Sequence, residues 1–144
     1  DDKLVYDGAK WVAKSSGIID QSTFTVDLEQ SGTTIYSGVL CRAVKYANGW
    51  VTVHVDQSTS TGLIPAGVAT IISAAGTPVP VGFRPPAAKT IYASSRVQEA
   101  GTRFDGEFLI DSSGGITIAK GIGGTFTATA SNGIFGATVS YIHA

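Results

Sequence analysis

Residues branched at Cβ dominate this sequence, and they constrain its fold more than any other feature. Valine, isoleucine and threonine supply 13, 13 and 16 of the 144 residues, whereas leucine and glutamate supply only 5 and 3. Branched side chains favour extended backbone and pack well on the pleated surface of a sheet. A helical bundle needs leucine, glutamate and lysine at helical spacing, so this composition excludes one and predicts an all-β protein.

Short runs of alternating apolar and polar residues, separated by turn residues, predict the strands. The runs cover residues 3–6, 23–29, 39–46, 50–57, 68–73, 90–93, 103–111, 116–120, 125–130 and 135–142. About ten strands without a helix point to an antiparallel Greek-key barrel or a jelly roll. Residues 1–20 are polar and weakly patterned, so we expect a neck or linker there and the compact domain over residues 21–144.

The pairing of neighbouring strands follows from keeping apolar residues together, because a shift of one residue turns every side chain to the other face. A three-residue loop Ala47-Asn48-Gly49, with Gly49 left-handed, joins two apolar rows. These rows are Val39, Cys41 and Ala43 opposite Val55, Val53 and Val51. The opposite face then carries Arg42, Tyr46, Trp50, His54 and Asp56.

This polar and aromatic face is the first candidate for a saccharide-binding site. An aromatic ring covers the apolar C–H face of a sugar, and planar hydrogen-bonding groups fix its hydroxyls. His54 and Asp56, with Trp50 and Arg42 nearby, supply both kinds of group. The alternative is that the aromatic residues pack against another sheet or a neighbouring subunit while His54 and Asp56 pair at the rim.

Two further hairpins are expected from glycine-containing turns. A tight turn at Asn132-Gly133 pairs residues 125–130 with residues 135–142. A turn over residues 112–115 pairs Phe108 with Ala119 and places Glu107 opposite Lys120.

Arg103, Asp105 and Glu107 share one face of the strand before that second turn, and they form the second candidate surface. The two carboxylates at positions i and i+2 lie roughly 6.5–7 Å apart along a strand, which a glycosidase could use. The alternative is that they are surface carboxylates paired with Arg103 and Lys120.

Motifs for catalysis or metal binding do not occur in the sequence. It has no phosphate-binding glycine loop, no Gly-x-Ser-x-Gly and no His-Glu-x-x-His, and its histidines are His54 and His143. We therefore expect no cofactor, no metal and no enzymatic activity. A net charge of -1 argues against nucleic acid or a membrane surface as a partner. The lone Cys41 is expected to be a small buried hydrophobic residue.

The most specific signal is Gly82-Phe83-Arg84-Pro85-Pro86, followed by the run from Gly106 through Gly114-Gly115 to Ile118. These segments resemble the C-terminal heads of phage tail receptor-binding proteins and tail-fibre tips, above all the heads of siphophages that infect lactococci. The proline pair fixes an extended rim segment, and Arg84 offers a forked donor there, so Arg84 joins the candidate residues.

The resemblance implies a β-barrel or jelly-roll head, assembled as a homotrimer on a narrow neck, that recognises host saccharide without cleaving it. In that family a groove near the interface between heads uses His, Asp, Arg and an aromatic ring, on the strand before the glycine-rich turn. Here this strand carries Glu107 and Leu109 at the places where His and Asp are expected, which points to a different saccharide. His54 and Asp56 precede the Phe-Arg-Pro element and do not correspond to the family's site.

The sequence thus predicts a virion adhesin at the distal tail, in a baseplate or a fibre tip. The expected partners are a host cell-wall saccharide, further copies of the same chain, and other baseplate proteins. The baseplate contacts are expected through a part preceding Asp1, because a chain without methionine is a piece of a longer product. The alternatives are a structural tail or baseplate module, a glycan depolymerase, and a C1q-like or lectin domain of cellular origin.

Overall fold

The computed structural model describes residues 3–6, 8, 11–14, 17–60, 70–73, 76–121, 124–127 and 132–143. The regular structure in these residues is almost entirely strand. The strands are β1 (Lys3–Tyr6), β2 (Trp11–Lys14), β3 (Ile18–Gln30), β4 (Thr33–Tyr46), β5 (Trp50–Val55), β6 (Ser58–Ser60), β7 (Thr70–Ser73), β8 (Thr90–Glu99), β9 (Thr102–Asp111), β10 (Ile116–Ala119), β11 (Asn132–Phe135) and β12 (Ala137–Ile142). A 3₁₀ turn, η1 (Val81–Phe83), is the one helical element of the described residues.

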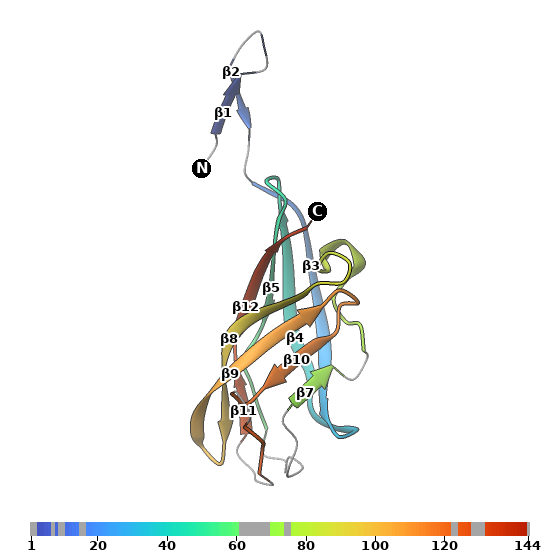
Figure 1. The fold of residues 1–144 in the computed structure, drawn as a ribbon, viewed down its shortest axis with the longest axis vertical. Coiled ribbons are helices and arrows are strands. Elements are labelled where there is room, and N and C mark those ends of the chain that lie inside the picture. Colours follow the sequence, from blue (N-terminus) through green and yellow to red (C-terminus); the bar gives the residue numbers. More distant parts are fainter. Residues whose placement is uncertain are drawn as a thin grey trace.

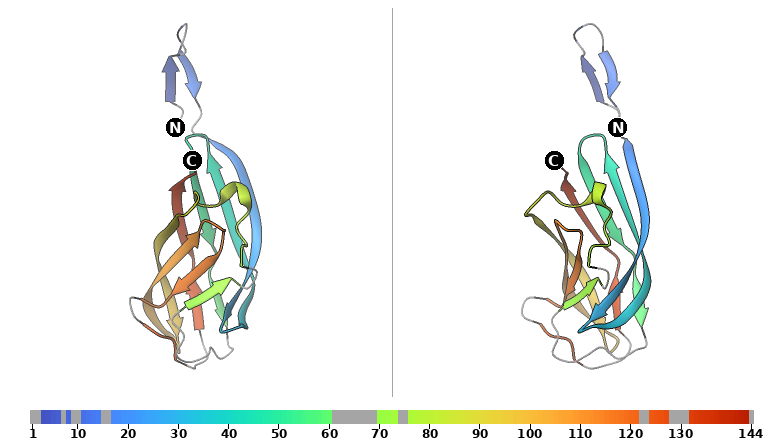
Figure 2. Two further views of the ribbon diagram at one scale, coloured as in Figure 1. Left: turned by 45° about the vertical axis from the view of Figure 1, so that its right-hand side comes forward. Right: turned by 90° about the vertical axis from the view of Figure 1, so that its right-hand side faces the viewer.

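Ten of the strands form one antiparallel sheet that folds over into two layers. Their order is β12-β5-β4-β3-β7-β10-β9-β8-β11-β6. Strands β7, β10, β9 and β8 lie in front of β3, β4, β5 and β12 in Figure 1, and the turned views in Figure 2 show both layers. Because β12 also packs beside β8, the sheet is a half-barrel. The predicted all-β, antiparallel fold class is confirmed.

The strands β1 and β2 form a separate two-stranded sheet within the predicted neck. It lies beyond the end of the ten-stranded sheet where the C-terminus is found (Figure 1). The first strand of the large sheet begins at Ile18, slightly before the predicted start of the compact domain at residue 21. No helix of the described residues has the length and apolar character needed to cross a membrane.

The hydrophobic core lies between the two layers and consists of the inward-facing residues of both. Those that are at most 1% exposed include Cys41, Ala43, Val51, Val53 and Val55 on one layer and Phe108, Ile110, Ile116 and Ile118 on the other. Each larger apolar side chain buried in this way stabilises the fold by about 1.5–3 kcal/mol. Burial, with a smaller effect of the nearby Asp56 carboxylate, raises the pKa of the Cys41 thiol to about 12, so Cys41 is a buried small residue as predicted.

The predicted loop Ala47-Asn48-Gly49 is confirmed, with Gly49 at a φ of 86°. Cys41 lies opposite Val55, and Ala43 lies opposite Val53. This register differs by two residues from the predicted one, and an even shift keeps every side chain on its predicted face. The outward row of β4 and β5 is therefore the one expected from the sequence.

The predicted turn at Asn132-Gly133 is wrong. Both residues lie inside β11, which pairs with β8 and β6, and β12 pairs with β5. Residues 124–127 are not a strand, and residues 128–130 of the predicted strand lie outside the described residues. The two-residue turns with positive φ at both positions occur instead at Ser31-Gly32 and Ala100-Gly101, which join the long hairpins β3–β4 and β8–β9. Long paired strands impose this turn even on serine and alanine, which adopt positive φ at some cost.

The hairpin β9–β10 has a register one residue away from the predicted one. Phe108 lies opposite Ile118 and Ile110 opposite Ile116, so apolar residues meet on the inner face. The Asp111 carboxylate fixes the turn by accepting hydrogen bonds from the backbone N–H groups of Ser113 and Gly115. Burial alone would raise the pKa of Asp111, but a hydrogen bond from the Ser113 hydroxyl, together with the backbone hydrogen bonds, outweighs it and lowers the pKa from its usual value.

Lys120 consequently does not lie opposite Glu107. Its ammonium group is 2.5 Å from Glu99 Oε2, and the two side chains are only 14% and 6% exposed. Glu99 also accepts a hydrogen bond from the backbone N–H of Thr127. Burial alone would raise the pKa of Glu99, but Lys120 and Thr127 together lower it below 4.5.

Candidate functional site

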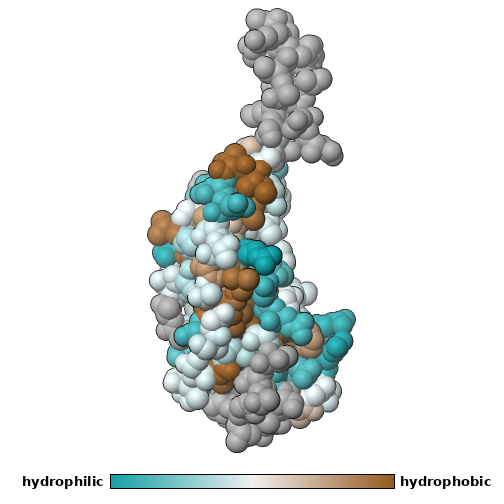
Figure 3. Space-filling model, turned by 180° about the vertical axis from the view of Figure 1, so that it is seen from behind, coloured by the Kyte–Doolittle hydropathy of each residue, from teal (hydrophilic) through white to brown (hydrophobic). Residues whose placement is uncertain are grey.

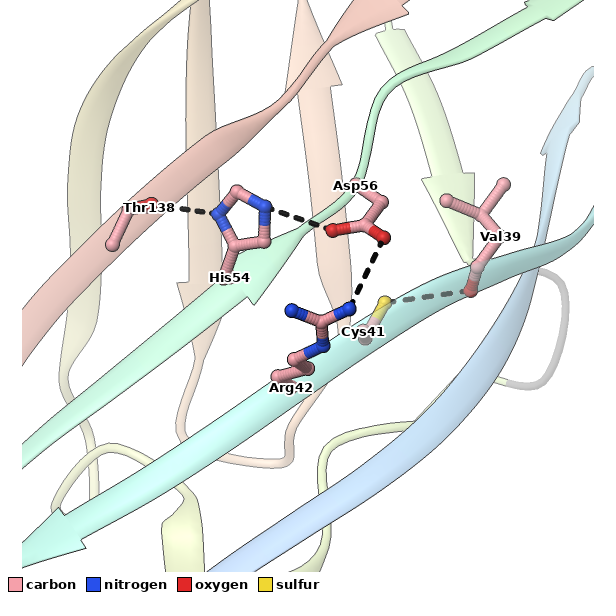
Figure 4. A network of polar contacts seen from close by, with 6 residues as sticks. All are labelled: Val39, Cys41, Arg42, His54, Asp56 and Thr138. Carbon is pink, nitrogen blue, oxygen red and sulfur yellow. Dashed lines mark hydrogen bonds and ion pairs between the residues drawn. The ribbon is translucent and has the colours of Figure 1, made fainter.

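Three of the predicted site residues form a network on the outer face of β4 and β5 (Figure 4). His54 Nε2 is 2.9 Å from Asp56 Oδ1, and Arg42 Nη2 is 3.9 Å from Asp56 Oδ2. The other ring nitrogen of His54 lies 2.8 Å from the Thr138 hydroxyl of β12. Exposed ion pairs of this kind contribute only about 0.2–1 kcal/mol to stability. The network is therefore mainly a set of hydrogen-bond donors and acceptors held at the surface.

Tyr46 and Trp50 lie at the other end of the same strands. Arg42 is opposite His54 in the register, and each aromatic residue is four positions further along its strand, about 13 Å away. Trp50 is opposite Ile142, and Tyr46 is opposite Ile18.

An exposed apolar patch surrounds these aromatic residues. We call Ile18, Ile19, Trp50 and Ile142, which are 42–62% exposed, the neck-side patch. Figure 3 shows apolar surface at this end of the domain. The sequence placed Trp50 and Tyr46 in one group with His54, whereas the structure places them with isoleucines.

A surface hollow of about 500 Å³ lies over the outer face of β8 and β9. Its lining residues are Tyr92, Ala93, Ser94, Asp105, Gly106, Glu107 and Gly121. Tyr92 is 59% exposed, and Ser94 is directly opposite Glu107. A hollow lined by an accessible phenol ring, two carboxylates and a hydroxyl group suits a sugar, whose C–H face stacks on a ring while its hydroxyls donate hydrogen bonds.

The floor of this hollow is formed by Gly106, and only glycine fits there. A Cβ atom at this position would stand 2.9 Å from the Ala119 carbonyl oxygen and 3.2 Å from Val97 Cγ1. Asp105 and Glu107 were predicted from the sequence, whereas Tyr92 was missed. The signal was present: Tyr92, Ser94 and Arg96 alternate on a strand whose second half, to Glu99, was not predicted.

A second hollow of about 350 Å³ adjoins the first. It is lined by Ser94, Ser95, Arg96, Asp105, Phe135 and Gly136, so Ser94 and Asp105 belong to both hollows. Arg96 lies opposite Asp105. The Arg103 guanidinium group lies over the Phe135 ring, 4.8 Å from its centroid, which holds the predicted Arg103 beside this second hollow.

Arg84 lies in the Phe-Arg-Pro segment, where its guanidinium group faces the backbone. Its Nε donates a hydrogen bond to the Val79 carbonyl at 2.7 Å, and one terminal nitrogen donates to the Thr77 carbonyl at 3.4 Å. Phe83 is buried, and its carbonyl accepts a hydrogen bond from the Tyr141 hydroxyl. The segment that carries the sequence resemblance is thus anchored to the core through its side chains.

The structure offers no metal centre in its described part, where no three His, Cys, Asp or Glu side chains are grouped. The sequence predicted no cofactor-binding site.

The likeness of this chain to known proteins is structural. No family model matches the chain, and no curated protein matches it. Among solved structures, the chain is similar to the crystal structure of the head domain of phage bIL170, described as a receptor-binding domain of a lactococcal phage. The identity is 17%, the match covers 83% of this chain and 96% of that chain, and the TM-score is 0.44. That protein is a head domain from the group of phages that the sequence resemblance named.

Proposed function

We propose that this domain is the receptor-binding head of a phage tail protein, and that it attaches the virion to a host cell-surface saccharide without cleaving it. The observation that carries the proposal is the hollow over β8 and β9, which the exposed Tyr92 ring lines together with Asp105 and Glu107. The sequence resemblance of the Phe83-Arg84-Pro85 segment to phage heads supports the same reading.

The setting of the two carboxylates supports the proposal of binding without cleavage. A glycosidase needs one carboxyl group whose pKa is raised in an apolar pocket, so that it can act as an acid. Asp105 and Glu107 are both exposed on the outer face of β9. Exposed carboxylates are suited to accepting hydrogen bonds from sugar hydroxyls.

The proposal includes a homotrimer at the distal tail of the virion. The neck-side patch supplies the contact surface, because four exposed apolar side chains at one end of a domain favour association with a further copy. When three heads are linked, the second and third binding events become intramolecular, which raises the overall avidity of a weak saccharide site. Light scattering on the purified chain tests this assembly, and a monomer would contradict it.

The saccharide proposal is tested by binding of the domain to a glycan array and to polysaccharide extracted from lactococcal cell walls. We expect Tyr92→Ala and Glu107→Gln each to weaken binding more than about tenfold, which corresponds to about 1.4 kcal/mol. Lys89→Ala, at an exposed position before β8, is the matched surface control and should bind like the wild type. Equal binding by all variants would contradict the site, and release of new reducing ends would contradict binding without cleavage.

The second candidate function is a structural tail or baseplate module, which the neck-side patch favours because it offers a protein-binding surface without any saccharide chemistry. It predicts no binding to any glycan or wall preparation. It also predicts that Trp50→Ala abolishes self-association, while Tyr92→Ala has no effect in any assay.

A further inference from the structure

The two hollows and the His54 network are continuous on the surface. The hollows share Ser94 and Asp105, and the second hollow ends at Gly136. A Cβ atom built on Gly136 would stand 3.2 Å from His54 Cε1. Gly136 thus touches the second hollow on one side and the His54 ring on the other.

The strand registers place these groups in one row across the strands. Asp105 lies opposite Arg96, and Arg96 lies opposite Phe135. After Gly136 the chain continues in β12, where Thr138 lies opposite His54, and His54 lies opposite Arg42. The row crosses from β9 over β8, the β11–β12 junction and β5 to β4, with an offset of three residues along the chain between Phe135 and Thr138. Four steps of about 4.8 Å across the strands and about 10 Å along the chain give this oblique row a span of about 22 Å.

No side chain interrupts the row at position 136, because this residue is a glycine. Gly136 is exposed, and it stands between a strand that pairs with β8 and a strand that pairs with β5. A glycine at such a junction often marks a place where another molecule approaches the backbone closely. Any side chain here would stand against the His54 ring and divide the row in two.

From this continuity we propose that the row is a single binding track for a linear oligosaccharide of several sugar residues, and not for one terminal sugar. The proposal rests on the proposed function and extends it to the class of ligand. One end of the ligand lies in the first hollow, which links Asp105 to Glu107 and Tyr92, and the other end contacts His54 and Arg42. Carboxylates, guanidinium groups, an imidazole and hydroxyls alternate along the track, which matches a ligand whose hydroxyls both donate and accept hydrogen bonds.

The test uses fragments of lactococcal cell-wall polysaccharide, size-fractionated after partial acid hydrolysis, in titration calorimetry with the purified domain. Affinity is expected to rise with fragment length until the track is filled. Arg42→Ala should weaken the long fragments about three- to tenfold, the loss of one or two hydrogen bonds, and leave the shortest binding fragments unaffected. Lys89→Ala removes an exposed cation that lines neither hollow and should change neither.

Gly136→Ala provides a second variant that leaves the track's polar groups in place. The φ of Gly136 lies outside the left-handed region, so alanine fits the backbone, and its methyl group would stand on the track beside His54. It should reduce the length dependence in the same way as Arg42→Ala. If long and short fragments bind equally tightly, or if neither variant affects long fragments, the track is overturned while the Tyr92 hollow stands. If no fragment of any length binds, the proposed function itself is overturned.

Discussion

The buried pair of Lys120 and Glu99 gives the sharpest stability prediction. In the variant Lys120→Met, the apolar stem of the side chain is kept against the Phe104 ring, over which the ammonium group lies 4.3 Å from the centroid. The Glu99 carboxylate, 6% exposed, then keeps the hydrogen bonds from the backbone N–H and the side chain of Thr127 but no cation. Removing one member of a buried ion pair costs about 3–5 kcal/mol, because the other charge stays buried without compensation.

A loss of about 4 kcal/mol is a large part of the 5–15 kcal/mol that stabilises an average domain. With a urea dependence of about 2 kcal/mol per molar, the midpoint of unfolding should fall by about 2 M. Urea titration followed by circular dichroism measures this shift. The double variant Glu99→Gln/Lys120→Met removes both charges and should recover part of the loss.

Lys89→Met is the control, because it removes an exposed lysine and should change the free energy of unfolding by less than about 0.5 kcal/mol. If Lys120→Met behaves like this control, the pair is solvated and the argument from burial is wrong. If the double variant is no more stable than Lys120→Met, the cost does not come from the stranded Glu99 charge.

Three further predictions concern stability and reactivity. The folded state lowers the pKa of Glu99 and of Asp111, so their contribution to the free energy of unfolding is present at neutral pH and is lost as the pH falls below about 4.5. Urea midpoints measured from pH 7 to pH 3 should therefore decrease in that window. A flat profile would contradict the hydrogen bonding described. The thiol of Cys41, buried and with its pKa raised to about 12, should react with a thiol reagent at neutral pH only after unfolding, so rapid labelling of the native protein would refute its burial. Gly106→Ala should lower the free energy of unfolding by about 1–3 kcal/mol, because the new methyl group would stand 2.9 Å from the Ala119 carbonyl oxygen. A variant as stable as the wild type in urea would show that the backbone around Gly106 can shift to accommodate the methyl group.

The fold class could be predicted because it depends on composition and alternation, which average over many residues. The loop at Gly49 and the outward face could be predicted because Cys41 and Ala43 meet valines only in registers of one parity, whereas alternation alone does not exclude the shift of two residues that the structure shows. The turn at Asn132-Gly133 could not be judged from local chemistry, since pairing of β11 with β8 overrides the turn preference of the dipeptide. Long-range pairing is the part of this fold that local sequence patterns do not encode.

The candidate site could likewise be predicted only where its residues lie on neighbouring strands. His54, Asp56 and Arg42 were grouped correctly because all three lie on neighbouring strands of one hairpin, where alternation gives the face. Tyr92 was missed because its place beside Glu107 depends on the β8–β9 pairing, and only the first half of β8 was predicted. The role of Gly136 depends on two strands that are far apart in the sequence, and no local pattern indicates it.

The central claim, that the hollow over β8 and β9 binds saccharide, is tested most directly by nuclear magnetic resonance. The ¹⁵N-labelled domain is titrated with lactococcal cell-wall polysaccharide fragments, and the backbone amide shifts are followed. The account predicts the largest shift changes at Tyr92, Ser94, Gly106 and Glu107, with smaller ones near His54 for long fragments. Changes confined to the neck-side patch, or no changes at any fragment concentration, would contradict it.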